Sequence, residues 1–187
     1  MGRGDWRTPT GGFHIATKEP DPSWEVPKSI QEEMRRNGKP VITSVPAGPD
    51  NPLGKYWLGF DRSGVGIHGT NSPNSIYRSA THGCIRMRAE SIEELFGKVE
   101  VNTAVNVIYQ PVLLGIDGDG IYLEAHPDVY KKGGDPVAVV RRLVTEAGVQ
   151  DRIVWETVKH VLAKREGIAR RIDVGTVSDA KSPASGG

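Results

Sequence analysis

Glycine and proline interrupt the first half of this chain so often that long helices are not expected there. The 187 residues include 23 glycines and 13 prolines, and most of the prolines lie before the midpoint. Proline removes a backbone donor and glycine weakens a helix, so this texture favours short strands joined by long loops. After Pro111 longer periodic segments begin. The sequence therefore predicts a mainly β first domain, residues 1–110, and a small α/β extension, residues 111–174.

The first domain is expected to contain four short strands and two helices. Phe13, Ile15 and Thr17 alternate as on a strand, and a proline and a glycine bracket a short charged helix. The predicted strands are 13–17, 56–60, 65–68 and 105–109, and the predicted helices are 28–37 and 89–99.

The extension is expected to open with a hairpin and continue with two helices. Two apolar strands, 112–116 and 121–125, flank the turn sequence DGDG. Asp135 and Pro136 form a good start for a helix that runs to Ala147. A second helix is predicted over 151–165, and the last residues, 175–187, have the composition of a disordered tail.

Composition excludes several classes of protein. The net charge is +1 with scattered basic residues, so no electrostatic footprint for nucleic acid is present. No apolar run approaches the roughly 20 residues of a membrane span. A single cysteine leaves two interpretations, an inert buried thiol or a reactive one.

The stretch GIHGTNSPNSIYRSATHGCIRM, residues 66–87, concentrates the residues that could carry chemistry. It contains the only cysteine, Cys84, together with His68, His82 and Arg86. A thiolate attacks acyl groups well, but a free thiol has a pKa of about 8.5 and needs a base or positive surroundings. Histidine supplies both, and backbone N–H groups near the cysteine could hold an oxyanion.

Simpler interpretations remain for the same residues. A lone cysteine is commonly buried as a small apolar residue, and both histidines could be structural. His68, His82 and Cys84 could also bind zinc, although a fourth ligand at a helpful spacing is missing. Arg86 could hold a carboxylate in a structural ion pair.

Three segments carry a family resemblance. HGTNS followed by THGCIRM resembles the signature of the YkuD-type L,D-transpeptidase family, GRGDWRTPTGGFHI resembles its G-x-W-x-TP-x-G-x-F-x-I segment, and NPLGKYWLGF resembles its strand pair before the first histidine. The likeness covers about residues 2–110, and the hairpin at 112–126 resembles the extension of some members. It implies a β-sandwich-like catalytic domain that needs no cofactor or metal.

The resemblance assigns catalytic roles to particular residues. Cys84 matches the nucleophile and His68 the general base, with the backbone carbonyl of Gly69 in the place that orients the base. The oxyanion hole is matched by the backbone N–H groups of His82, Gly83 and Cys84.

Two further residues match the family's substrate side. Arg86 matches an arginine that shapes the site and meets a substrate carboxylate. Thr81 stands where the family usually has serine, and it keeps the hydroxyl.

The implied reaction is a two-step acyl transfer on peptidoglycan. Cys84 would attack a tetrapeptide stem, release D-Ala and form a thioester, which an amine of a second stem, an outer-membrane lipoprotein lysine or water would resolve. The alternatives are an L,D-carboxypeptidase or amidase, and a non-catalytic peptidoglycan-binding module. The resemblance also implies acylation by carbapenems.

The location follows from the same resemblance. A peptidoglycan enzyme is expected in the periplasm or at the cell wall, yet Met1 is followed directly by GRGDWRTPT without an apolar signal region. In the family, strands precede the segment that starts here. We therefore expect the N-terminal strands and the export signal to lie outside this sequence.

Overall fold

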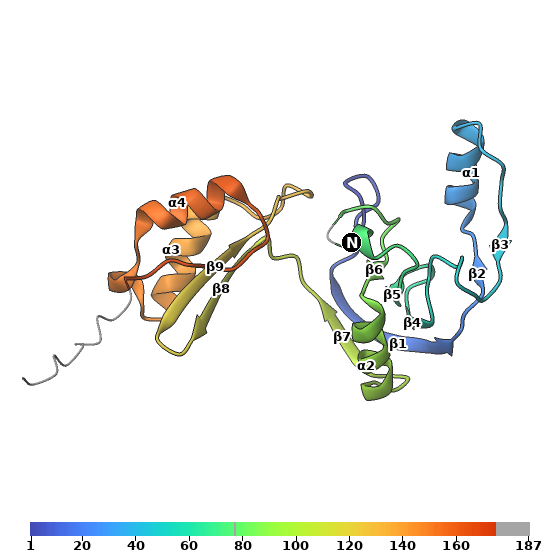
Figure 1. The fold of residues 1–187 in the computed structure, drawn as a ribbon, viewed down its shortest axis with the longest axis horizontal. Coiled ribbons are helices and arrows are strands. Elements are labelled where there is room, and N and C mark those ends of the chain that lie inside the picture. Colours follow the sequence, from blue (N-terminus) through green and yellow to red (C-terminus); the bar gives the residue numbers. More distant parts are fainter. Residues whose placement is uncertain (77, 175–187) are drawn as a thin grey trace, which may run out of the picture. The chain divides into compact units, whose positions relative to one another are not determined.

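The computed structural model describes residues 1–76 and 78–174 (Figure 1). The chain divides into two compact units, Met1–Ile108 and Tyr109–Gly187. The tail predicted for 175–187 lies outside the described residues. None of the described helices is long and apolar enough to span a membrane.

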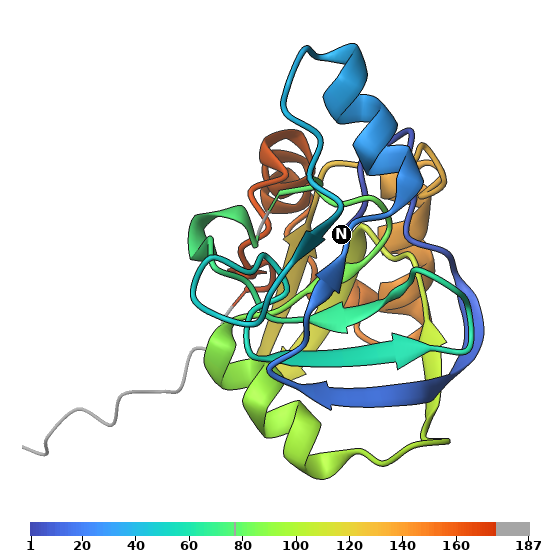
Figure 2. The same cartoon turned by 90° about the vertical axis from the view of Figure 1, so that its right-hand side faces the viewer.

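The first unit is built on a five-stranded sheet in the order β6-β5-β4-β1-β7, with helix α2 packed beside it (Figure 2). All neighbours are antiparallel except β5 and β6, which run parallel. The sheet elements are β1 (Gly11–Pro20), β4 (Tyr56–Phe60), β5 (Gly66–His68), β6 (Ile85–Arg86) and β7 (Ala104–Val107), and the helix is α2 (Ala89–Lys98).

Alternating apolar residues explain how this sheet obtains its core. Ile15 and Phe60 pair across β1 and β4, and both are buried. Ile92 of α2 and Leu58 of β4 join the same cluster with almost no exposed surface. The mainly β character expected for this part of the chain is confirmed.

A charged helix, α1 (Lys28–Arg36), lies between two very short paired strands, β2 (Trp24–Glu25) and β3 (Ser44–Val45). Pro27 sets its first turn, and Gly38 just beyond it adopts a φ of +66°. None of its residues is buried. The helix therefore contributes no buried side chain to the core, and polar side-chain contacts hold it in position. A 3₁₀ turn, η1 (Pro73–Ser75), lies further along.

The second unit packs two helices on a three-stranded sheet in the order β10-β9-β8. Buried aliphatic residues such as Leu123, Val140 and Val158 form one core that is separate from that of the first unit. The elements are β8 (Val112–Asp117), β9 (Gly120–Ala125), α3 (Pro136–Glu146), the 3₁₀ turn η2 (Gln150–Arg152), α4 (Trp155–Lys164) and β10 (Arg170–Arg171).

Several details differ from the sequence-based expectations, which did not include the two-residue strands β2, β3 and β6. The second helix was expected from residue 151, but α4 begins at Trp155 because the preceding residues act as a strand edge: Val154 N–H donates to the Ile172 oxygen, and Ile153 forms a bridge with Asp173. β10 was not anticipated, since two arginines carry no strand signal. The first strand is longer than expected, because it pairs with β7 at one end and β4 at the other.

Candidate active site

The parallel pair β5–β6 brings the two halves of the sequence motif together. His68 lies opposite Arg86 and Ile67 opposite Ile85 in this pair. Residues paired in register, and residues two apart on one strand, project from the same face of a sheet. Cys84 directly precedes β6, about 6.6 Å along the strand direction from the His68–Arg86 pair. His68, Cys84 and Arg86 therefore share one face.

The imidazole of His68 is buried, with 5% of the residue exposed. Burial, followed by the positive charge of Arg86, lowers its pKa to about 4, although the backbone oxygens of Gly69 and Leu53 oppose the change. Neither oxygen forms a hydrogen bond of normal geometry with Nδ1, which has no partner among the described residues. The ring is neutral at pH 7, so it is able to accept a proton.

The thiol of Cys84 is partly exposed and is bonded to backbone. Its Sγ donates to the Gly64 oxygen at 3.4 Å. Burial raises the pKa of this thiol, while the Gly66 N–H and the Arg86 guanidinium oppose the rise. These shifts favour a neutral thiol and a neutral imidazole at pH 7, rather than a preformed ion pair.

Arg86 is the fixed positive charge of this face. Burial lowers its pKa, and its interaction with Cys84 opposes the shift. Its buried Nε has no hydrogen-bond partner, and no carboxylate of the described residues forms an ion pair with it. The structural ion pair considered from the sequence is thus not found in the described part of the chain.

The turn that carries Cys84 is closed by the hydroxyl of Thr81, which is buried. Its Oγ1 donates to the Cys84 oxygen at 2.7 Å and accepts a long hydrogen bond, 3.4 Å, from the Gly83 N–H. Gly83 has a φ of +115°, a conformation that disfavours any side chain. The hydroxyl of Thr81 therefore holds the turn, and its expected contact with substrate stays a prediction.

The ring of His82 points into a charged cluster. Its Nε2 lies 2.7 Å from Glu33 Oε2 and 3.1 Å from Arg3 Nη2. A carboxylate only accepts and a guanidinium only donates, so the shorter contact favours a proton on Nε2. Trp6 packs against the ring with centroids 5.0 Å apart. His68 and His82 therefore have different surroundings, and only His68 shares the face of Cys84.

Glu33 joins α1 to this turn. Arg3 donates two hydrogen bonds to its carboxylate, at 2.9 and 2.8 Å, and these bonds, followed by the His82 bond, lower the pKa of Glu33 to about 2. Neither Arg3 nor Glu33 was identified as a site residue from the sequence. The separation of 49 residues between Glu33 and His82 left no local signal for their contact.

The start of the chain supports the same turn through its backbone. Gly2 forms a parallel bridge with Thr81, and the Arg3 N–H donates to the Thr81 oxygen at 3.0 Å. A side chain at Gly2 would collide with the backbone oxygen of Trp6. Gly2 therefore permits the close approach of this segment.

The zinc alternative requires His68, His82 and Cys84 to converge. The His82 ring instead meets Glu33 and Arg3. Among the described residues, no three histidine, cysteine or acidic side chains are grouped so that they could hold a metal ion.

Comparison with known proteins places this geometry in a family. The model of the L,D-transpeptidase catalytic domain family, YkuD, matches residues 1–107. The chain belongs to this family. It is 42% identical over 113 residues to the probable L,D-transpeptidase YbiS of Escherichia coli K12, a match that covers 60% of the chain and 37% of YbiS.

Two further L,D-transpeptidases illustrate the extent of the similarity. The probable L,D-transpeptidase ErfK/SrfK of Salmonella typhimurium is 32% identical over 171 residues, covering 86% of the chain and 54% of that protein. The catalytic domain of the Enterococcus faecium L,D-transpeptidase acylated by ertapenem is 28% identical, with a TM-score of 0.42 over 57% of the chain and 74% of that domain. The chain thus spans about half or less of its two curated relatives.

Proposed function

We propose that this L,D-transpeptidase family member is a cysteine acyltransferase that acts on the tetrapeptide stems of peptidoglycan. The observation that carries the proposal is the shared face of Cys84, His68 and Arg86. It supplies a thiol, a neutral buried base and a cation that has no carboxylate partner among the described residues. A non-catalytic binding module has no need of this combination, which favours the enzyme.

The first step forms a thioester. The Cys84 sulfur attacks the carbonyl carbon before the terminal D-Ala while the His68 ring takes the thiol proton. The resulting oxyanion is held by backbone N–H groups of the turn at His82, Gly83 and Cys84. When the intermediate collapses, the C–N bond to D-Ala breaks and His68 returns the proton to the leaving amine.

The second step regenerates the thiol. An amine loses a proton to His68 and attacks the thioester carbonyl, and the departing sulfur recovers that proton. With a second stem as acceptor the product is a cross-link, and with an outer-membrane lipoprotein lysine it is an attached protein. Water as acceptor would make the protein an L,D-carboxypeptidase.

The neutral resting pair fits this order of events. A base with a pKa of about 4 does not deprotonate the thiol before substrate arrives. Proton transfer then accompanies attack, when the developing oxyanion and the charge of Arg86 favour the charged products. Arg86 also offers its free donors to a stem carboxylate, which would orient the substrate.

Glu33 acts in this proposal as a positioning residue. It holds the ring of His82, and the backbone of His82 and Gly83 leads directly to Cys84. The turn that must present N–H groups to the oxyanion is thereby tied to α1 and Arg3.

The activity proposed here places the protein in the periplasm or at the cell wall.

Purified tetrapeptide-bearing muropeptides test the proposal. Incubation with the protein should release D-Ala and yield a cross-linked dimer, detected by mass spectrometry. A tripeptide product alone would indicate an L,D-carboxypeptidase. Unchanged muropeptides would contradict both the transpeptidase and the carboxypeptidase hypotheses. Meropenem should add once to the intact protein, on Cys84, because the open thiol is the only cysteine.

A further inference from the structure

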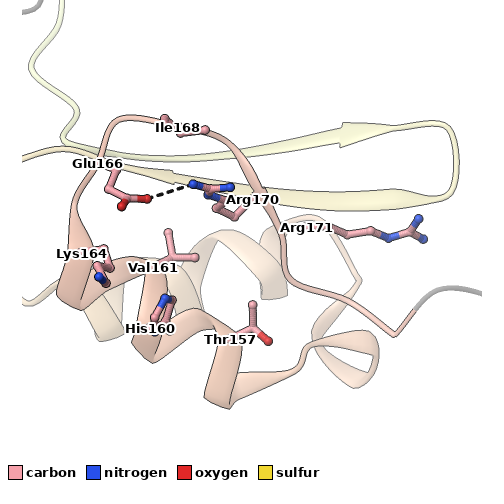
Figure 3. A pocket seen from close by; sticks show the side chains of 8 residues that line it. All are labelled: Thr157, His160, Val161, Lys164, Glu166, Ile168, Arg170 and Arg171. Atoms are coloured by element: carbon pink, nitrogen blue, oxygen red, sulfur yellow. Dashed lines mark hydrogen bonds and ion pairs between the residues drawn. The ribbon is translucent and has the colours of Figure 1, made fainter.

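A groove of about 420 Å³ lies in the second unit between α4 and the segment that leads into β10 (Figure 3). Its helical wall consists of residues three or four positions apart, which lie on one face of a helix. Its other wall belongs to residues 166–171. The lining residues are Thr157, His160, Val161, Lys164, Glu166, Ile168, Arg170 and Arg171. The catalytic face described above uses none of them.

The second wall ends in an edge strand. In the order β10-β9-β8, β10 (Arg170–Arg171) has a hydrogen-bonded neighbour on one side only within the described chain, and from Ile172 onward the backbone also bonds to residues 152–154. The free side of an edge strand presents backbone N–H and C=O groups that another extended chain can pair with. Extended peptides are bound by proteins through the addition of a strand to an exposed sheet edge.

The groove is also amphipathic. Val161 is buried at the helical wall, whereas Ile168 on the opposite wall is 51% exposed. Figure 3 shows Thr157, His160 and Val161 projecting from α4 toward the opposite wall. A ligand in the groove would therefore bury apolar surface as well as meet polar groups.

Positive charge is concentrated around the groove. The lining residues include three basic side chains, Lys164, Arg170 and Arg171, and one acidic side chain, Glu166. Glu166 neutralises Arg170 at 3.1 Å, and Asp173 and Asp119 pair with Arg171. Lys164 forms no ion pair with the described residues. An anionic ligand would find a free cation there.

We propose that this groove binds an extended acidic peptide segment of a protein partner. Its backbone would pair with the free edge of β10, a carboxylate would meet Lys164, and an apolar side chain would rest on Val161 and Ile168. The volume lies in the range of specific ligand pockets, about 300–1,000 Å³. The apolar lining and the strand edge favour a peptide over a phosphate polymer, which offers neither an apolar side chain nor a peptide backbone.

Fluorescence anisotropy on the full chain tests the proposal with a labelled hexapeptide that alternates glutamate and valine. We expect saturable binding, weakened at least tenfold by Lys164→Glu. Lys159→Glu, an equal charge change on the same helix outside the groove, should alter the affinity less than threefold. Both side chains are exposed, so both variants should keep the wild-type melting temperature.

Two further probes separate peptide recognition from simple charge attraction. A hexapeptide methylated at alternate backbone nitrogens should bind at least tenfold more weakly, because it cannot pair with β10. Equal affinity of the methylated peptide, equal effects of the two lysine variants, or tighter binding of inorganic polyphosphate than of the acidic peptide would overturn the proposal.

Discussion

The chemistry of the proposed active site depends on how differently two neighbouring groups are solvated. His68 is buried and neutral, while Cys84 is a thiol whose burial disfavours the thiolate. Neither group is activated by a permanent ion pair. In the proposed mechanism Arg86 supplies positive charge during attack, and it has no carboxylate partner among the described residues.

Replacement of the nucleophile gives the simplest prediction. Cys84→Ala and Cys84→Ser should abolish D-Ala release, because no other side chain on this face provides a strong nucleophile. The melting temperature should change little, since the residue is only partly buried. Release of D-Ala by the alanine variant would show that the proposed nucleophile is wrong.

The general base should be identified by comparing the two histidines. His68→Ala should lower kcat/KM by about 10²-fold or more, the usual loss on removing a general base. His82→Ala should cost less, because its ring contacts Glu33 and its backbone N–H is retained. Steady-state D-Ala release measures both, and a near-normal rate for His68→Ala would reverse the assignment.

The pH dependence follows from the lowered pKa of His68. Catalysis needs the neutral ring, so kcat/KM should fall on the acid side with a midpoint near 4, well below the usual histidine value of about 6.5. Because the pKa of Cys84 is raised, alkylation by iodoacetamide should keep increasing above pH 8.5 or so. An acid midpoint between about 6 and 7 would instead indicate a preformed thiolate–imidazolium pair.

At the scale of elements, the tie between α1 and the Cys84 turn is a feature that local pattern does not reveal. The sequence indicated the helix correctly, since a proline and a glycine bracket it, but its two apolar residues, Ile30 and Met34, do not show what its charged residues contact. The long-range pair of Glu33 and His82 therefore appears only in three dimensions.

Glu33→Ala should slow acylation more than it weakens substrate binding. Without the carboxylate, the His82 ring and the turn lose their anchor, and we expect kcat to fall about tenfold, or about 1.4 kcal/mol, with little change in KM. Glu33→Gln should keep one hydrogen-bond acceptor, so its kcat should lie between those of the wild type and Glu33→Ala. Glu32→Gln, on the same helix and exposed, is the matched control.

The rate at which meropenem acylates Cys84, monitored by stopped-flow fluorescence, measures the effect of Glu33 on acylation directly. Equal acylation rates for wild type, Glu33→Ala and Glu32→Gln would show that α1 does not position the turn. If the wild-type protein itself released no D-Ala, the result would contradict the proposed function rather than the role of Glu33.

Other elements were predictable to different degrees. The motif histidine, cysteine and arginine were all singled out from the sequence, and the parallel pairing of β5 and β6 sets His68 opposite Arg86 although they are 18 positions apart. The late start of α4 was not predictable, because helical periodicity continues through Ile153 and Val154, whereas their backbones bond to the 172–173 segment. At the start of α4, long-range backbone pairing overrides the local preference for helix.

At the scale of the whole molecule, two separate cores divide the chain. One cluster surrounds Leu58 and Ile92 in the first unit, and the other surrounds Leu123 and Val140 in the second. Each unit therefore has its own source of hydrophobic stabilisation. The buried Asp173 belongs to the second, where it accepts hydrogen bonds from Arg171, Arg152 and the Ile121 N–H.

Differential scanning calorimetry should resolve this division through two variants. Leu58→Ala leaves a cavity in the first core, a change that typically costs about 2–5 kcal/mol, and should lower the transition of the first unit. Asp173→Asn removes the charge that two arginines share, so it should lower the transition of the second unit. At 20–25 °C or so, Leu58→Ala should lower D-Ala release more than Asp173→Asn does, because Cys84 and His68 belong to the first unit. If both variants shift one common transition by similar amounts, the two cores unfold together and the division has no thermodynamic meaning.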